Sequence, residues 1–220
     1  MADVLIIGGH GKVALLATPL LTEAGHTVTA VVRNPDHAED VRAAGAEPLV
    51  LDVERASREE LEEALRGRDA VVWAAGAGGG DAARTKAVDR DAAIASMDAA
   101  EAAGVPRYVM VSYLGASLDH GVPEDHPFHA YAQAKAEADE YLRASSLDWT
   151  ILGPGALTLD EPTGAVAVDP RLTDDEDKST SRANVARMIV AALDAEAAAG
   201  RHVEFTDGPT PIPEVFAAGA

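Results

Sequence analysis

Two residue types that can move protons stand four positions apart in the second half of the chain, at Tyr131 and Lys135. Apolar residues at helical spacing continue from here to Ser145, and residues four apart on a helix share a face. An ammonium beside a phenol stabilises the phenolate and lowers the tyrosine pKa from about 10 toward working pH. Tyr131 would then be a usable general acid or base. An incidental surface pair is the alternative interpretation.

Ser112 ends the apolar run 108–111 that precedes this segment. The run has the character of a buried strand, so Ser112 and the pair on the following helix can converge above the end of that strand. A serine hydroxyl in this place can bond a substrate oxygen on which charge develops. We therefore predict that Ser112, Tyr131 and Lys135 are the catalytic residues.

A glycine cluster near the start of the chain indicates which kind of ligand lies near these groups. The sequence VLIIGGHGKVA occupies residues 4–14, where a short apolar run meets Gly8, Gly11 and Ala14 at three-residue spacing. In a strand-to-helix turn the first glycine permits the bend, the second lets the backbone approach a pyrophosphate, and the third small residue packs helix on strand. The helix that follows aims its free N–H groups at an anion. An ordinary strand–helix turn is the alternative.

Arg33 ends the strand–helix–strand unit that this turn opens, after a second apolar run at 27–32. Versions of the unit that prefer NAD usually carry an acidic residue here for the adenosine ribose hydroxyls. Arg33 cannot accept such bonds, but its fork suits a phosphate. We therefore predict NADP(H) over NAD(H), with Lys12 as a second positive contact. A solvated surface arginine is the alternative.

The elements that must position these residues alternate along the chain. Apolar runs at 4–7, 27–32, 47–51, 70–74, 108–111 and 148–152 read as buried strands, and the segments between them have helical spacing or helix caps such as Ser57 with Glu60. The alternation predicts a parallel sheet flanked by helices. The fold class is therefore α/β, a Rossmann-type doubly wound parallel sheet.

Two further segments follow strand ends and are expected near the cofactor. Ligands of open α/β sheets lie beyond the carboxyl ends of the strands, so Asp52 could bond the adenine amino group and Val53 could cover the adenine ring. A helix-capping role is the alternative for Asp52. Small residues at 74–80 leave room for a cofactor opposite the glycine turn, or form a flexible solvent loop. Lys135 could bond the nicotinamide ribose. Together these features predict hydride transfer at a carbonyl-type carbon, with Tyr131 carrying the proton.

Composition excludes several other classes. The chain has 220 residues, 18 basic against 37 acidic, a net charge of −19 and no cysteine. Such a surface repels nucleic acid and anionic membranes, and no apolar run approaches the ~20 residues of a membrane helix. The chain enters its first strand without a signal-peptide pattern, so a cytoplasmic location is expected. No metal is expected, because His126 and His129 have no third ligand in register and the acidic run 174–177 reads as solvated surface.

Six motifs together resemble the short-chain dehydrogenase/reductase superfamily, and within it the atypical NmrA-like, NAD(P)H-binding subgroup. They are GGHGKVA (8–14), VVRNP (31–35), LDV (51–53), WAAGAG (73–78), VMVS (109–112) and YAQAK (131–135). The resemblance covers nearly the whole chain. It implies a Rossmann fold with cofactor contacts at Gly8, Gly9, His10, Gly11, Lys12, Val13, Arg33, Asp52, Val53, Ala74, Ala75, Gly76, Lys135 and Pro154. The chain departs from the pattern at Ala14, which replaces the last glycine, and at Gly153, where relatives often have arginine.

The remaining chain limits the substrate. We expect one domain over residues 1–220, in which 153–220 form a small C-terminal substrate-side part. That length is too short for the large lobe of sugar-nucleotide epimerases, so a small carbonyl, quinone or flavin-like substrate is expected. A non-catalytic NADP(H) sensor that acts through a protein partner and an epimerase or dehydratase are the alternatives. No feature of the sequence indicates the oligomeric state.

Overall fold

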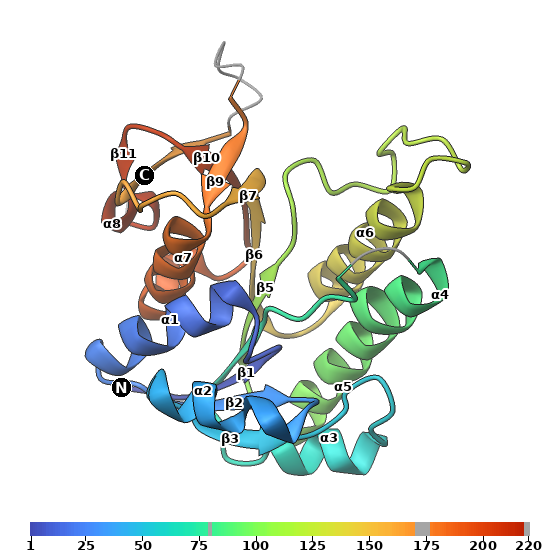
Figure 1. The fold of residues 1–220 in the computed structure, drawn as a ribbon, viewed down its shortest axis with the longest axis vertical. Coiled ribbons are helices and arrows are strands. Elements are labelled where there is room, and N and C mark those ends of the chain that lie inside the picture. Colours follow the sequence, from blue (N-terminus) through green and yellow to red (C-terminus); the bar gives the residue numbers. More distant parts are fainter. Residues whose placement is uncertain (79–80, 170–176, 218–220) are drawn as a thin grey trace.

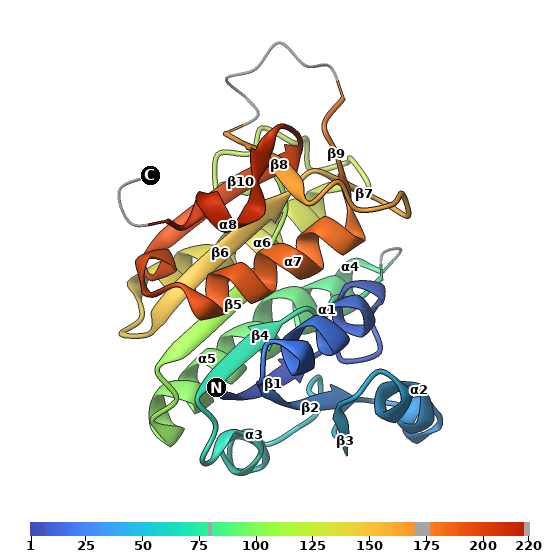
Figure 2. The same ribbon diagram turned by 90° about the vertical axis from the view of Figure 1, so that its left-hand side faces the viewer.

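The protein is built around a nine-stranded sheet with helices on both faces (Figure 1). The computed structural model describes residues 1–78, 81–169 and 177–217. Two glycines of the predicted cofactor loop, 79 and 80, and most of the acidic run, 174–176, lie outside the described residues. The strand order is β11-β8-β10-β6-β5-β4-β1-β2-β3, and Figure 2 shows the strands stacked in this order along the molecule.

Seven neighbouring strands of this sheet run parallel. They are β1 (Asp3–Ile7), β2 (Thr27–Val32), β3 (Glu47–Val50), β4 (Ala70–Trp73), β5 (Arg107–Val111), β6 (Asp148–Pro154) and β10 (Arg201–Asp207). The order reverses between β1 and β4, where Ile6 pairs with Val72 on one side and Ala30 on the other. The predicted doubly wound parallel sheet is confirmed, and ligands of such sheets bind beyond the strand ends at this reversal.

Each face of the sheet has its own apolar core, because successive strand residues point to opposite faces. Val4 and Ile6 pack into the core beneath α1 (Lys12–Glu23) and α7 (Arg182–Asp194). Leu5 and Ile7 pack into the core beneath α3 (Arg58–Leu65), α5 (Ala93–Ala103) and α6 (His129–Ala144). Figure 1 shows these two helix groups on either side of the sheet. Strands covered on both faces explain the uninterrupted apolar runs of the sequence.

The helical segment over residues 82–103 contains an irregularity. It begins as α4 (Ala82–Thr85), continues as a π-helical segment, η2 (Lys86–Ala92), and ends as α5, which stops at Gly104 with φ +73°. Short π segments inside helices often occur at functional sites. This one carries Asp89, whose carboxylate accepts a hydrogen bond from the Ala77 backbone N–H at 3.0 Å.

Smaller elements complete the sheet and its connections. The segment after β2 folds as η1 (Pro35–His37) and α2 (Ala38–Ala43), and Ser57 with Glu60 forms the expected capping box at α3. Ser181 caps α7 through the Asn184 backbone N–H. The remaining elements are β7 (Ala156–Thr158), β8 (Ala165–Val168), β9 (Ser179–Ser181), η4 (Glu196–Ala198), β11 (Thr210–Pro211) and α8 (Ile212–Val215). β8 pairs antiparallel with β10, at the Phe205 end of β10.

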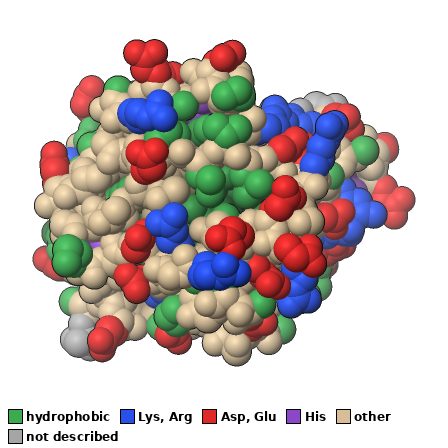
Figure 3. Space-filling view, turned by 90° about the horizontal axis from the view of Figure 1, so that it is seen from below, with side chains coloured by type: hydrophobic (Ala, Val, Ile, Leu, Met, Phe, Trp, Pro, Cys, Tyr) green, Lys and Arg blue, Asp and Glu red, His purple; other side chains and the backbone are tan. Residues whose placement is uncertain are grey.

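Positively and negatively charged side chains are mixed on one face of the molecule. On the face shown in Figure 3, acidic and basic side chains stand next to each other around a hydrophobic area. Arg58 and Glu62 of α3 form one surface ion pair at 2.6 Å. That face therefore offers no continuous basic surface of the kind that nucleic-acid binding uses. Within the described residues, no helix combines the length and the apolar character needed to cross a membrane.

Candidate functional site

The glycine turn after β1 is held tightly against two neighbouring segments. Gly8 has φ +91°, and a Cβ there would lie 2.5 Å from the Ala75 backbone nitrogen. A Cβ at Gly9 would lie 2.5 Å from the Ala30 side chain. Ala14, in the first turn of α1, is fully buried, as expected for the small residue that packs helix against strand. Glycine is required at positions 8 and 9 because the chains meet too closely for a side chain.

The N-terminus of α1 lies at this glycine turn and has no capping side chain. Gly11 is the N-cap, and no described side chain accepts a hydrogen bond from this helix end. The first N–H groups of a helix have no partner inside the helix and carry its positive dipole end, so they suit an anion. Val13 is buried in the core through its side chain, so any contact it makes with an anion comes from its backbone. Lys12 is exposed.

A cavity of about 340 Å³ opens beside this turn. It is lined by nine residues predicted from the sequence, which are Gly8, His10, Gly11, Arg33, Asp52, Val53, Ala74, Ala75 and Gly76. The prediction missed Glu54, Arg84, Asn34, His37 and four apolar residues that also line it: Val31, Val32, Leu51 and Val88. Apolar walls, an open helix N-terminus and arginine at the rim fit the adenosine and pyrophosphate part of a dinucleotide. The His10 ring stacks on the His37 ring at 3.6 Å and bonds Asp40 at 2.8 Å.

The second polar region lies at the end of β5, against α6. The Lys135 side chain is 1% exposed, and its ammonium donates a hydrogen bond to the Val111 carbonyl at 2.8 Å and lies 3.4 Å from the Met110 sulfur. Burial lowers the pKa of Lys135, while the carboxylates of Asp139 and Asp89 act in the opposite direction. The lysine is therefore a buried group bonded to a strand end, and the negative charges of two aspartates favour its charged form. It does not line the cavity beside the glycine turn.

Ser112 is bonded to a partner that the sequence analysis did not single out. Its hydroxyl donates to the Asp139 carboxylate at 2.5 Å. Asp139 is fully buried, and its second oxygen makes no hydrogen bond within the described residues. Burial raises the pKa of Asp139, opposed by the charge of Lys135 and the bond from Ser112. In this arrangement Ser112 can accept a hydrogen bond from a substrate, and it can donate one only by leaving Asp139.

Tyr131 stands among aromatic side chains rather than beside an ammonium. Its ring centroid is 5.5 Å from that of Tyr113 and 5.3 Å from that of Phe128. Burial, together with the negative charge of Asp89 and other nearby acidic groups, raises the pKa of Tyr131. The expectation that Lys135 lowers this pKa is wrong for this conformation, because the ammonium is turned to the Val111 carbonyl. Tyr131 is held as a neutral phenol.

Asp89 connects the polar region to the loop after β4. It is 2% exposed, accepts the Ala77 N–H, and its other oxygen would lie 3.1 Å from a Cβ at Gly76. Burial raises the pKa of Asp89, and the charges of Lys135 and Arg84 oppose the rise. Asp89 and Asp139 thus place two carboxylates around one buried ammonium.

Pro154 and Gly153 lie at the end of β6. The Pro154 carbonyl accepts the Leu114 N–H at 2.8 Å, and Pro154 is not among the residues that line the cavity. A Cβ at Gly153 would lie 3.1 Å from Glu204 and 3.2 Å from the Tyr113 carbonyl. A larger side chain at this position would therefore require these neighbours to shift by a few tenths of an ångström.

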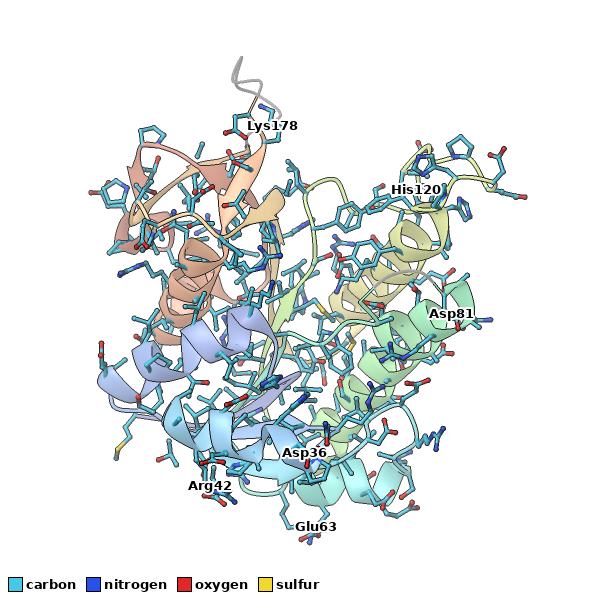
Figure 4. All side chains as sticks on the ribbon, in the orientation of Figure 1. Asp36, Arg42, Glu63, Asp81, His120 and Lys178 are labelled. Atoms are coloured by element: carbon cyan, nitrogen blue, oxygen red, sulfur yellow. The ribbon has the colours of Figure 1, made fainter. Side chains whose placement is uncertain are left out.

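The histidines before α6 order their own loop. His120 accepts the Val122 N–H at 3.0 Å, His126 accepts the Phe128 N–H at 3.1 Å, and His129 bonds the Val122 carbonyl. Figure 4 shows His120 in this loop near the top of α6, above Asp81 of the α4 region. Over the chain that the structure describes, no group of three or more potential ligands is arranged to hold a metal ion.

Comparisons with known proteins agree with this geometry. The model of the NAD(P)H-binding family matches residues 8–196. YhfK of Bacillus subtilis, described as an uncharacterized sugar epimerase, is 35% identical and covers 97% of this chain and 98% of its own length. A solved structure from Bacillus halodurans, described as a candidate NAD-dependent epimerase/dehydratase, is 35% identical with a TM-score of 0.89 over 98% of this chain and 99% of its own. The oxidoreductase ylbE of Lactococcus lactis is 27% identical with a TM-score of 0.84 over 97% and 94%. The chain belongs to the NAD(P)H-binding family of the atypical short-chain dehydrogenase/reductase type.

Proposed function

We propose that the protein is an NADP(H)-dependent oxidoreductase that moves a hydride between the nicotinamide and a small carbonyl, quinone or flavin-like substrate. The observation that carries the proposal is the cavity next to the reversal of strand order, which is lined by Gly11 at the open end of α1 and by Arg33 after β2. Bound there, the cofactor supplies the hydride. A cytoplasmic location and a role for residues 153–220 on the substrate side belong to the same proposal.

The residues around Tyr131 would handle the proton. As a neutral phenol, Tyr131 would donate its proton to the substrate oxygen while the neighbouring carbon receives the hydride, so that a carbonyl becomes an alcohol. Ser112, whose own proton is directed to Asp139, would steer that oxygen by accepting a bond from it once it is protonated. The Lys135 ammonium, which is bonded to the Val111 carbonyl, would bond the nicotinamide ribose after turning away from that carbonyl.

The aromatic side chains beside Tyr131 support a planar substrate. The Tyr113 and Phe128 rings meet edge to face at 5.4 Å, and the Phe128 side chain is partly exposed. Such rings bind flat apolar molecules by stacking and edge contacts. A sugar nucleotide, by contrast, needs many polar contacts. The descriptions of the two epimerase-like relatives favour an epimerase or dehydratase as the second candidate.

The test is NADPH consumption with a panel of quinones, flavins and simple ketones, in the wild type and two variants. Tyr131→Phe is expected to lower kcat by about 10²- to 10⁴-fold, the usual contribution of a positioned general acid, and to leave the dissociation constant of NADPH unchanged. Tyr141→Phe is the matched control, because Tyr141 lies on the same helix and bonds only Asp98 on the exposed side among the described residues. Full turnover by Tyr131→Phe would refute the assignment of the proton donor.

Absence of turnover with any substrate, together with tight NADPH binding, would favour the sensor over the enzyme. Conversion of a nucleotide sugar without net NADPH consumption would favour the epimerase. Cofactor preference is tested separately, by dissociation constants for NADPH and NADH. Arg33→Gln is expected to weaken NADPH binding by roughly 10- to 100-fold, because a charge-assisted bond contributes about 1.5 to 3 kcal/mol, and to leave NADH binding nearly unchanged.

A further inference from the structure

Two arginines from different elements share one carboxylate at the cavity wall. The same Glu54 oxygen lies 3.7 Å from a terminal nitrogen of Arg33 and 3.5 Å from the Nε of Arg84. Arg33 directly follows β2, Glu54 lies in the turn after β3, and Arg84 belongs to α4. All three line the cavity. The wall therefore contains a two-cation site with an anion already in it.

Arg84 is held in place more firmly than Arg33. One of its terminal nitrogens donates to the Ala77 carbonyl at 2.7 Å, which ties α4 to the loop after β4. Its backbone N–H faces the carboxylate of Asp81. The Arg33 side chain is 58% exposed. Arg84 thus presents a fixed positive edge, and Arg33 can close on an anion from the other side.

Glu54 is held only loosely between them. Both distances exceed hydrogen-bond length, and the Glu54 side chain is 26% exposed. Long, partly exposed ion pairs contribute little to stability. Its backbone N–H is bonded to Asp52 at 3.3 Å, so the side chain can swing away while the turn stays in place. A stronger anion can displace this carboxylate at low cost.

We propose that Arg33 and Arg84 together bind the 2′-phosphate of NADP(H), and that Glu54 decides between the two cofactors. This inference rests on the proposed function. A phosphate carries more charge than a carboxylate and offers several acceptor oxygens to two guanidinium forks. NADP(H) would displace Glu54. NAD(H), which lacks the phosphate, would leave Glu54 where it can accept bonds from the ribose hydroxyls, as acidic residues do in NAD-binding sites.

The test uses two adenosine fragments that need no catalysis, adenosine 2′,5′-bisphosphate and adenosine 5′-monophosphate, with binding measured by calorimetry. Glu54→Gln is expected to tighten binding of the bisphosphate by about 5- to 10-fold, because it removes a competing negative charge. It is expected to leave binding of the monophosphate equal or weaker. Arg84→Gln is expected to weaken the bisphosphate by roughly 10-fold without changing the monophosphate.

Arg55→Gln is the matched control. Its side chain is 87% exposed and pairs with Asp52 at 3.9 Å, on the same turn as Glu54 but outside the cavity wall. Arg84→Lys, which keeps the charge, is expected to retain part of the bisphosphate affinity even if Arg84→Gln disturbs α4. Equal effects of Glu54→Gln on both fragments, or no effect, would overturn the inference while the oxidoreductase proposal stands. If neither fragment binds the wild type, the proposed function itself fails.

Discussion

Replacing Lys135 with methionine removes a buried charge while keeping a flexible side chain of similar length. In the wild type the ammonium bonds the Val111 carbonyl at 2.8 Å, and its charge lowers the pKa values of Asp89 and Asp139 against the effect of their burial. In the variant both carboxyl groups stay buried and lose that favourable charge. Their pKa values in the folded state therefore rise further above the unfolded values.

The raised pKa values translate into a stability that depends on pH. A carboxyl group with a raised folded-state pKa favours the folded state fully below its unfolded pKa of about 3.9, and this contribution is lost as pH rises through the folded-state pKa. When the folded state binds one proton more than the unfolded state, the free energy of unfolding falls by about 1.4 kcal/mol for each pH unit of increase. The further rise of these pKa values makes the variant less stable at neutral pH. Because removal of one partner from a buried ion pair costs about 3 to 5 kcal/mol, we expect a loss of this order.

Urea unfolding of the wild type and Lys135→Met at pH 5 and pH 8 measures the effect. The deficit of the variant is expected to be larger at pH 8, because the carboxyl groups can take up protons at pH 5. Lys86→Met, on the exposed side of the π segment, should stay within about 0.5 kcal/mol of the wild type. The double variant with Asp139→Asn should recover part of the loss. A deficit of equal size at both pH values would show that the ammonium does not neutralise the buried carboxylates.

Three further predictions concern stability. Gly8→Ala and Gly25→Ala change residues with nearly the same φ, +91° and +90°, but of the two only Gly8 has backbone atoms at 2.5 Å from an added Cβ. In thermal unfolding, Gly25→Ala should lose about 1 to 2 kcal/mol of stability, and Gly8→Ala should lose about 1 to 3 kcal/mol more. Equal losses would contradict the close packing of the turn. Ser57→Ala removes the α3 capping box and should cost about 1 kcal/mol in urea unfolding, whereas an unchanged midpoint would mean that the box adds nothing. Ser112→Ala leaves Asp139 buried without its hydrogen bond and should lower the stability by about 1 to 3 kcal/mol at neutral pH. If the unbonded carboxylate is the cause, adding Asp139→Asn should restore stability. A loss that persists in this double variant would contradict that explanation.

The parallel sheet could be predicted because its strands obey a local rule. A strand covered on both faces is a short apolar run, and runs such as 4–7 and 108–111 are bounded by polar residues or glycine. Gly104, with φ +73°, ends a helix where the sequence indicates a stop.

The charged neighbours of the site could be predicted only in part. Asp139 lies four residues after Lys135 on α6, so helical spacing alone places the two on one face. Asp89 lies in the π segment of an alanine-rich helix, which changes the direction of its side chain. No local sequence pattern predicts this π segment. Arg84 and Glu54 meet only because α4 and the turn after β3 are adjacent in space. Contacts of this kind depend on the tertiary packing of distant segments.

The buried charges also bear on the direction of the proposed reaction. Tyr131 is kept protonated by burial and by the negative charge of Asp89, and a protonated phenol can give a proton but cannot take one. In the proposed reaction, Tyr131 in this state would serve as the proton donor for reduction of a substrate. Oxidation would require the phenolate, which a cation must stabilise, and the Lys135 ammonium is directed to the Val111 carbonyl instead. If Tyr131 acts as proposed, the negative charges of Asp89 and Asp139 would therefore favour its role as proton donor, because both raise its pKa.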